Sequence, residues 1–145
     1  MSLAVKRIRQ GAQWSGVTLE DKPSVWQRRV LGSLLRLKQL PQSWDSYGSP
    51  QLQYGAEAAA AELIASLAFL EPPLPHVAPV PGGGVQFEWE HGNKSLEIEV
   101  QPDGSMEYLV VTETGQAGEG PIAQKHTQVP LLIRWLTASH DRPNR

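Results

Sequence analysis

Glutamate carboxylates form the densest group of ionisable side chains in this sequence. They alternate with apolar residues in three short runs, at Glu88, Glu90, Glu97, Glu99 and Glu107. Neighbouring side chains of a strand point to opposite faces, so the alternation predicts that all five carboxylates share one face of a sheet. Three interpretations stay open: a solvated face, a face that binds a basic partner, and catalytic carboxylates. The last needs a cleft and shifted pKa values, which an open face does not provide.

No metal or cofactor motif is visible. The chain has no cysteine, no Gly-x-Ser-x-Gly motif and no dinucleotide-binding glycine pattern. None of the histidines has a second ligand at metal-site spacing (His76, His91, His126 and His140). We therefore expect no metal and no cofactor, and we favour a protein without enzymatic activity. The alternative is a small enzyme with an acid/base site assembled around Asp45 and Glu88.

The loop Leu40–Pro50 is the most unusual local segment. Trp44 and Tyr47 flank Asp45 in a turn that ends at Gly48. Ser and Asp side chains in such turns accept hydrogen bonds from nearby backbone N–H groups. Either the aromatics clamp the connection between two helices, with Asp45 as an acceptor inside the loop, or the loop is a recognition loop that carries binding residues.

The elements that position these side chains begin with a β-meander over residues 84–112. Apolar residues meet across the first hairpin if Glu90 lies opposite Ser95, which also sets Glu88 opposite Glu97. A Pro-Asp-Gly turn closes the second hairpin with Gln101 opposite Ser105 and sets Glu99 opposite Glu107. Val77–Val80 would add a fourth strand at the edge. The Gly-rich segment 113–125 is interpreted as a flexible connection.

Three amphipathic helices are expected, over residues 22–40, 49–70 and 127–139. Ser49 is predicted to cap the second helix, with Pro50 at its first position. Gly55 inside that helix costs about 1 kcal/mol relative to alanine. We therefore expect it to make a close contact, with the Leu40–Pro50 loop. Three tryptophans are expected in or beside the core: Trp26, Trp89 and Trp135.

These elements, in the order α-α-β-β-β-α, define an α+β fold: an antiparallel meander of three or four strands packed against about three helices. The length of 145 residues corresponds to one domain. We place a basic arm at residues 1–21, the domain at 22–140 and a polar tail at 141–145. There is no secretory signal and no run of about 18 apolar residues, which favours a cytoplasmic protein that does not enter a membrane.

Charge is unevenly distributed along the chain. Basic residues predominate before residue 41 and after residue 120. Residues 41–120 contain twelve acidic residues and one lysine. The favoured interpretation is that the basic ends pack against the acidic middle. The alternative is that the basic arm binds nucleic acid through Lys6, Arg7 and Arg9, joined by Arg28 and Arg29 on the first helix. The acidic middle makes nucleic acid an unlikely partner.

A family resemblance rests on two stretches of the chain. They are Leu40-Pro-x-x-Trp44-Asp45-x-Tyr47-Gly48, and Pro79-Val-Pro-x-Gly-Gly-x-Gln86-x-Glu88-Trp89 with the following Leu96-Glu-Ile-Glu-Val. Over residues 40–108 the chain resembles a family of small bacterial proteins of unassigned function. The resemblance implies that Trp44, Asp45, Tyr47, Gln86, Glu88 and Trp89 form one constellation, with the loop lying on the sheet. It also implies an accessory role, such as that of an antitoxin or immunity protein.

These observations favour a non-enzymatic module that binds a protein partner, antitoxin-, immunity- or regulator-like. The acidic face indicates a basic partner, and self-association stays open. The predicted binding residues are Trp44, Asp45, Tyr47, Gln86, Glu88, Glu97 and Glu99.

Overall fold

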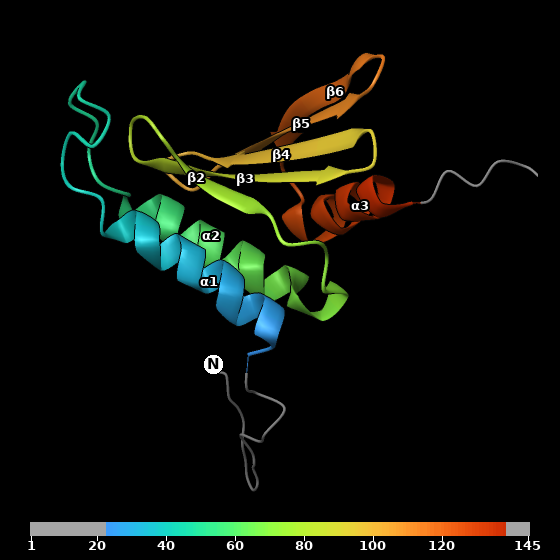
Figure 1. Cartoon of the computed structure of the whole chain (residues 1–145), viewed down its shortest axis with the longest axis horizontal. Coiled ribbons are helices and arrows are strands. Elements are labelled where there is room, and N and C mark those ends of the chain that lie inside the picture. The colour runs from blue at the N-terminus through green and yellow to red at the C-terminus, as the bar shows by residue number, and fades with distance from the viewer. Residues whose placement is uncertain (1–22, 139–145) are drawn as a thin grey trace, which may run out of the picture.

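The structure, a computed structural model, describes residues 23–138. Three helices lie on one side of a five-stranded antiparallel sheet (Figure 1). The helices are α1 (Val25–Lys38), α2 (Tyr54–Leu67) and α3 (Lys125–Thr137), with a 3-10 turn η2 (Ala68–Leu70) after α2. The strands, in sheet order, are β2 (His76–Val80), β3 (Gly84–His91), β4 (Lys94–Val100), β5 (Met106–Thr112) and β6 (Gly115–Ile122). The predicted α+β class is confirmed, with five strands in place of three or four.

The register of the meander agrees with the sequence prediction. Trp89 pairs with Leu96, and Glu90 pairs with Ser95, across the first hairpin. In the second hairpin the backbone N–H of Gln101 donates to the Ser105 carbonyl, and Gly104 takes the left-handed conformation at φ 94°. Alternating residues of the strands therefore enter the core, since a register is fixed wherever one face is buried.

Strand β6 corrects the expectation of a flexible connection at residues 113–125. It pairs with β5 along its length, with Gly118 opposite Val110 and Gly120 opposite Tyr108. Two of the positions of β6 that face the helices, Gly118 and Gly120, are glycines, and only Ile122 at the end of the strand brings an apolar side chain to the core, so no apolar alternation marks the strand in the sequence. Backbone pairing with β5 defines it instead.

All three helices begin at different residues from those expected, and α1 runs from Val25 to Lys38 in place of residues 22–40. Helix α2 starts at Tyr54 and not at Ser49, because the backbone N–H of Gln53 donates to the Gly83 carbonyl and ties the preceding segment to the β2–β3 turn. Helix α3 starts at Lys125, and the side-chain oxygen of Gln128 accepts from two backbone N–H groups just before the helix. Helix α1 follows Pro23 and is capped by Ser24, whose side chain accepts a hydrogen bond from the Gln27 backbone N–H.

Two tryptophans join the helices to the sheet in the core. Trp26 of α1 and Trp89 of β3 are buried, and both donate from Nε1 to the carbonyl oxygen of Pro73, at 3.4 and 2.7 Å. The Pro-rich segment before β2 is thereby held between α1 and the sheet. The third tryptophan, Trp135 of α3, is half-buried beside the core.

The two glycines inside helices provide a matched test of packing. A Cβ on Gly55 would lie 2.4 Å from the Pro102 carbonyl oxygen, so the predicted close contact is present but is made by the β4–β5 turn and not by the Leu40–Pro50 loop. A Cβ on Gly32 would meet no atom within 4 Å. We expect Gly55→Ala to lower the free energy of unfolding by about 1–3 kcal/mol through overpacking. We expect Gly32→Ala to raise it by about 0.4–1 kcal/mol.

Urea denaturation of both variants measures these effects. Effects of the same sign for the two substitutions would contradict this account of the helix packing.

Within residues 23–138, no helix has the length and apolar character needed to cross a bilayer.

Candidate functional site

Six glutamates share the sheet face opposite the three helices, which we call the acidic face. Two cross-strand pairs place carboxylates directly opposite each other: Glu88 with Glu97, and Glu99 with Glu107. The register extends these rows across the sheet to Leu109 and β6. The glutamates of the acidic face are Glu88, Glu90, Glu97, Glu99, Glu107 and Glu119.

The strands hold these carboxylates in place because their alternate residues are fixed in the core. Phe87, Ile98 and Val110 are buried against the helices, so their neighbours along each strand must point to the other side. The acidic face is therefore positioned by the core and not by a loop.

The charges on the acidic face repel one another. Burial raises the pKa of Glu97, and the carboxylates of Glu88 and Glu99 raise it further. Neutral amides supply the local hydrogen bonds: Gln86 Nε2 donates to Glu88 at 2.6 Å, and Gln101 Nε2 donates to Glu99 at 2.9 Å. These bonds orient two carboxylates but cancel none of their charge.

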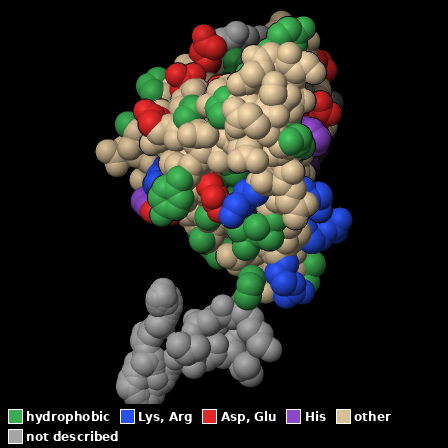
Figure 2. All heavy atoms as spheres, turned by 90° about the vertical axis from the view of Figure 1, so that its left-hand side faces the viewer, with side chains coloured by type: hydrophobic (Ala, Val, Ile, Leu, Met, Phe, Trp, Pro, Cys, Tyr) green, Lys and Arg blue, Asp and Glu red, His purple; other side chains and the backbone are tan. Residues whose placement is uncertain are grey.

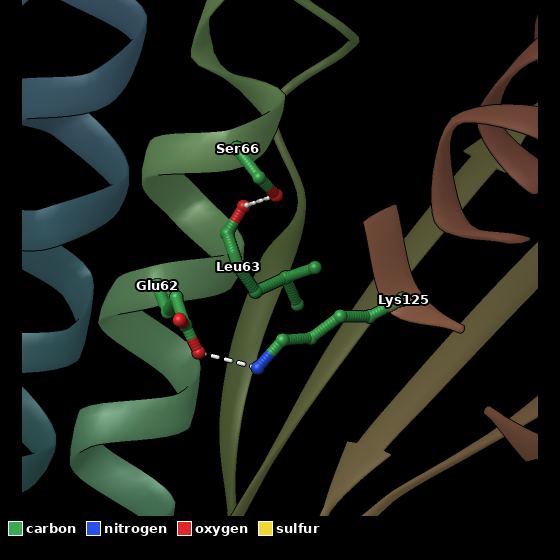
Figure 3. Close-up of polar contacts among 4 residues, drawn as sticks. All are labelled: Glu62, Leu63, Ser66 and Lys125. Carbon is green, nitrogen blue, oxygen red and sulfur yellow. Dashed lines mark hydrogen bonds and ion pairs between the residues drawn. The ribbon is translucent and has the colours of Figure 1, made fainter. Parts of the chain in front are cut away.

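The ion pairs of the described residues lie away from the acidic face. Within residues 23–138, the ion pairs are Lys38–Glu57, at 2.8 Å, and Lys125–Glu62, and both end on α2. Figure 3 shows Lys125 reaching from the start of α3 to Glu62. The expected packing of basic ends against the acidic middle is thus seen at α2, whereas neither ion pair includes a carboxylate of the acidic face.

Charge is separated across the molecule as well as along the chain. Figure 2 shows acidic side chains gathered toward the sheet and basic side chains toward the helices. The two basic residues Arg28 and Arg29 are exposed on α1, on the helix side. The other residues of the nucleic-acid hypothesis, Lys6, Arg7 and Arg9, lie outside the described residues, as does the polar tail.

The Leu40–Pro50 loop is organised around the carboxylate of Asp45. Its Oδ1 accepts from the backbone N–H groups of Tyr47, at 2.9 Å, and Ser49, at 3.2 Å, and its Oδ2 accepts from the Ser49 hydroxyl at 2.5 Å. The Ser49 hydroxyl and the Tyr47 N–H hold the pKa of Asp45 below its ordinary value of 3.8. Asp45 is thus the intraloop acceptor of the first interpretation.

We expect Asp45→Asn to lower the midpoint of thermal unfolding at pH 7. A carboxyl whose pKa is depressed by folding stabilises the fold at neutral pH, and that contribution is lost as the pH falls through the depressed pKa. The difference between wild type and variant should therefore shrink as the pH falls below 3.8. Thermal unfolding followed by circular dichroism from pH 7 to pH 2.5 measures it, and a difference that grows on acidification would contradict the assignment.

The two aromatic residues of the loop have different surroundings. Trp44 is half-buried and lines a small cavity at the β2–β3 turn together with Leu37, Pro50 and Pro79. Tyr47 is 91% exposed. Trp44 therefore anchors the loop, and Tyr47 is the loop aromatic that a partner could contact.

The structure divides the constellation implied by the family resemblance. Gln86 and Glu88 lie on the acidic face, while Trp89 points into the core from the same strand. Asp45 makes its hydrogen bonds inside the loop, and its lowered pKa is the reverse of what a general acid requires. This arrangement gives no support to an enzyme built on Asp45 and Glu88.

Of the predicted binding residues, the structure brings together Gln86, Glu88, Glu97 and Glu99. Asp45 makes its hydrogen bonds within the Leu40–Pro50 loop, and Trp44 lines a small cavity at the β2–β3 turn. Within residues 23–138, no three histidine or acidic side chains lie close enough to hold a metal ion.

Sequence reasoning missed three residues of the acidic face. Glu119 joins it because β6 pairs with β5, which sets Glu119 opposite Leu109. Leu109 and Val111 bring half-buried apolar surface to the same face. Their position on this face follows from the second hairpin register, which places Tyr108 and Val110 on the helix side. The alternation in β5 was therefore enough to predict it.

Together these features define a two-layer α+β domain with an open, acidic sheet face on which Leu109 and Val111 lie beside the carboxylates. Comparisons with protein-family models, curated proteins and solved structures find no match to this chain.

Proposed function

We propose that the chain is a non-enzymatic module that binds a basic protein partner on its acidic face. The observation that carries this proposal is the pair of like-charge contacts, Glu88 with Glu97 and Glu99 with Glu107, on a face that no ion pair of the described residues relieves. Like charges directly opposite each other on a sheet cost stability. Cationic side chains of a partner would convert that repulsion into attraction.

The composition of the face also supports a protein partner. Leu109 and Val111 lie among the glutamates and are half-buried. Protein interfaces combine an apolar centre with a polar rim, and complementary charge guides the encounter. A partner surface that presents lysine or arginine around an apolar centre would match this arrangement.

The edges of the sheet favour docking on the face over strand addition. The edge strands β2 and β6 carry Pro79 and Pro121. Proline has no N–H to offer to a further strand and is one of the devices that block sheet edges. A partner is therefore expected to lie across the strands and contact their side chains.

The kind of role we propose is antitoxin-, immunity- or regulator-like, in a bacterial cytoplasm. The resemblance of residues 40–108 to small bacterial accessory proteins supports this part of the proposal, and the acidic face supplies the chemistry. An antitoxin-like protein would neutralise its partner by covering a basic surface.

A tagged pull-down from the native host, at low salt and with mass spectrometry of the eluate, tests the proposal. We expect a stoichiometric protein with a basic surface, released when the ionic strength is raised, because salt screens exposed charges. A partner that stays bound at about 1 M salt, where the screening length is about 3 Å, would argue against an interface built on charge.

A further inference from the structure

A concavity lined by basic residues lies on α1, away from the acidic face. It has a volume of about 460 Å³. Its walls carry arginine and serine side chains on one side and apolar residues of the Pro-rich segment on the other. The residues that define it are Arg28, Arg29, Gly32, Arg36, Leu74 and Pro75.

Three arginines, Arg28, Arg29 and Arg36, line the concavity, and their charge is not compensated by an ion pair within the described residues. Neither ion pair of residues 23–138 includes them. Arg36 Nη2 donates to the Ser33 hydroxyl at 3.0 Å, and Arg28 Nη1 donates to the Pro23 carbonyl at 3.1 Å. Each bond holds a guanidinium in place with one of its five N–H donors, and the other donors remain for a ligand.

Gly32 provides a second, independent observation. It lies in the middle of α1, where glycine is a poor helix former, and the backbone there has no positive φ that would require it. No neighbouring atom lies within 4 Å of where its Cβ would be, so packing does not require it either. The absence of a side chain at this position keeps the concavity open between the arginines and Leu74.

We propose that this concavity binds the phosphate group of a small phosphorylated molecule. The planar guanidinium of arginine pairs with two phosphate oxygens at once, which makes arginine the preferred side chain for phosphate. Leu74 and Pro75 form an apolar wall against which the organic part of the ligand would lie. This site is separate from the acidic face, and the proposal does not depend on a protein partner.

Isothermal titration of the full chain with inorganic pyrophosphate at low salt tests the proposal. We expect saturable binding of one pyrophosphate per chain, and at least a tenfold loss of affinity in Arg29→Gln/Arg36→Gln. Arg134→Gln, which removes an exposed arginine of α3 outside the concavity, serves as the charge control and should bind as wild type does. No binding by wild type, or an equal loss in the Arg134 variant, would overturn the proposal.

Gly32→Ala separates binding from folding. A methyl group in the concavity should weaken pyrophosphate binding at least threefold while the melting temperature stays the same or rises. Unchanged affinity in this variant would overturn the assigned position. A parallel titration with a short single-stranded oligonucleotide distinguishes the source of the phosphate: oligonucleotide binding without pyrophosphate binding would overturn a small-molecule site.

Discussion

Exchanging Glu97 and Glu99 for glutamine will weaken capture of a basic partner by about tenfold or more at low salt, while the free chain becomes more stable. Both residues belong to the central strand β4 and face carboxylates of the neighbouring strands, Glu88 and Glu107. Removing two of the interacting charges relieves repulsion worth about 0.2–1 kcal/mol per pair. The same change removes attraction to a cationic surface, and tenfold in affinity corresponds to about 1.4 kcal/mol.

The stability gain has a predicted pH dependence. The pKa of Glu97 is raised by folding, so its ionised form penalises the folded state at neutral pH, and the penalty disappears as the pH falls. The difference in free energy of unfolding between wild type and variant should therefore vanish below 4.5, the ordinary pKa of Glu97. Urea denaturation at pH 7 and at pH 4 measures it, and a gain that persists unchanged at pH 4 would contradict the electrostatic explanation.

Glu71→Gln/Glu113→Gln is the matched control for binding, since it removes the same charge from exposed positions outside the acidic face. It should capture the partner as wild type does. Equal losses in both double variants would mean that net charge, and not the acidic face, governs the interaction.

Replacing Trp89 by alanine will cost about 3–5 kcal/mol of folding free energy, the range for truncating a large buried aromatic side chain. Trp89 is 2% exposed, stacks beside Phe87 and donates its Nε1 proton to the Pro73 carbonyl. Since small domains are stable by about 5–15 kcal/mol, the loss is a large part of the total. Urea denaturation at 25 °C measures the change.

Trp89→Phe keeps the fold testable if the alanine variant does not fold. It preserves an aromatic ring but removes the hydrogen bond to Pro73, so we expect a loss of about 1–2 kcal/mol, with part of it from the smaller ring. Leu35→Ala is the control, because Leu35 is 55% exposed on α1 and should change stability by about 0.5 kcal/mol or less. A loss at Leu35 equal to that at Trp89 would contradict the position of the core.

The central part of the fold is predictable from the sequence because each local signal there agrees with the packing. Alternation in β3 and β4 fixes which residues are buried, and the Pro-Asp-Gly turn selects the second register. The alternation in β3 and β4 is enough to predict that Glu88 lies opposite Glu97. The acidic face was therefore predictable except for β6.

The remaining errors occur where backbone contacts between distant segments decide the structure. The prediction for β6 is wrong because two of its inward positions, Gly118 and Gly120, are glycines and leave no apolar alternation to detect. The prediction for the start of α2 is wrong because Ser49 bonds to Asp45, and the chain stays attached to the β2–β3 turn through Gln53 and Gly83. No local pattern of side chains reports such contacts.

In the candidate site, too, the positions on strands were predictable and the position of the loop was not. Carboxylates on strands could be assigned to one face from their spacing alone, since the strand period is two. The Leu40–Pro50 loop has no such period, and the place of Trp44 beside Leu37 and Pro79 depends on segments that are distant in the sequence. The hydrogen bonds inside the loop make Asp45 its internal acceptor, which is one of the two roles that the sequence left open.

The most direct test of the acidic face compares three tagged proteins in one pull-down from the native host at low salt: wild type, Glu97→Gln/Glu99→Gln and Glu71→Gln/Glu113→Gln. Quantitative mass spectrometry of the eluates is the measurement. Our account predicts one stoichiometric basic protein with wild type and with the Glu71/Glu113 variant, and at least tenfold less of it with the Glu97/Glu99 variant. Equal recovery by all three, or no protein above background with wild type, would contradict binding through the acidic face.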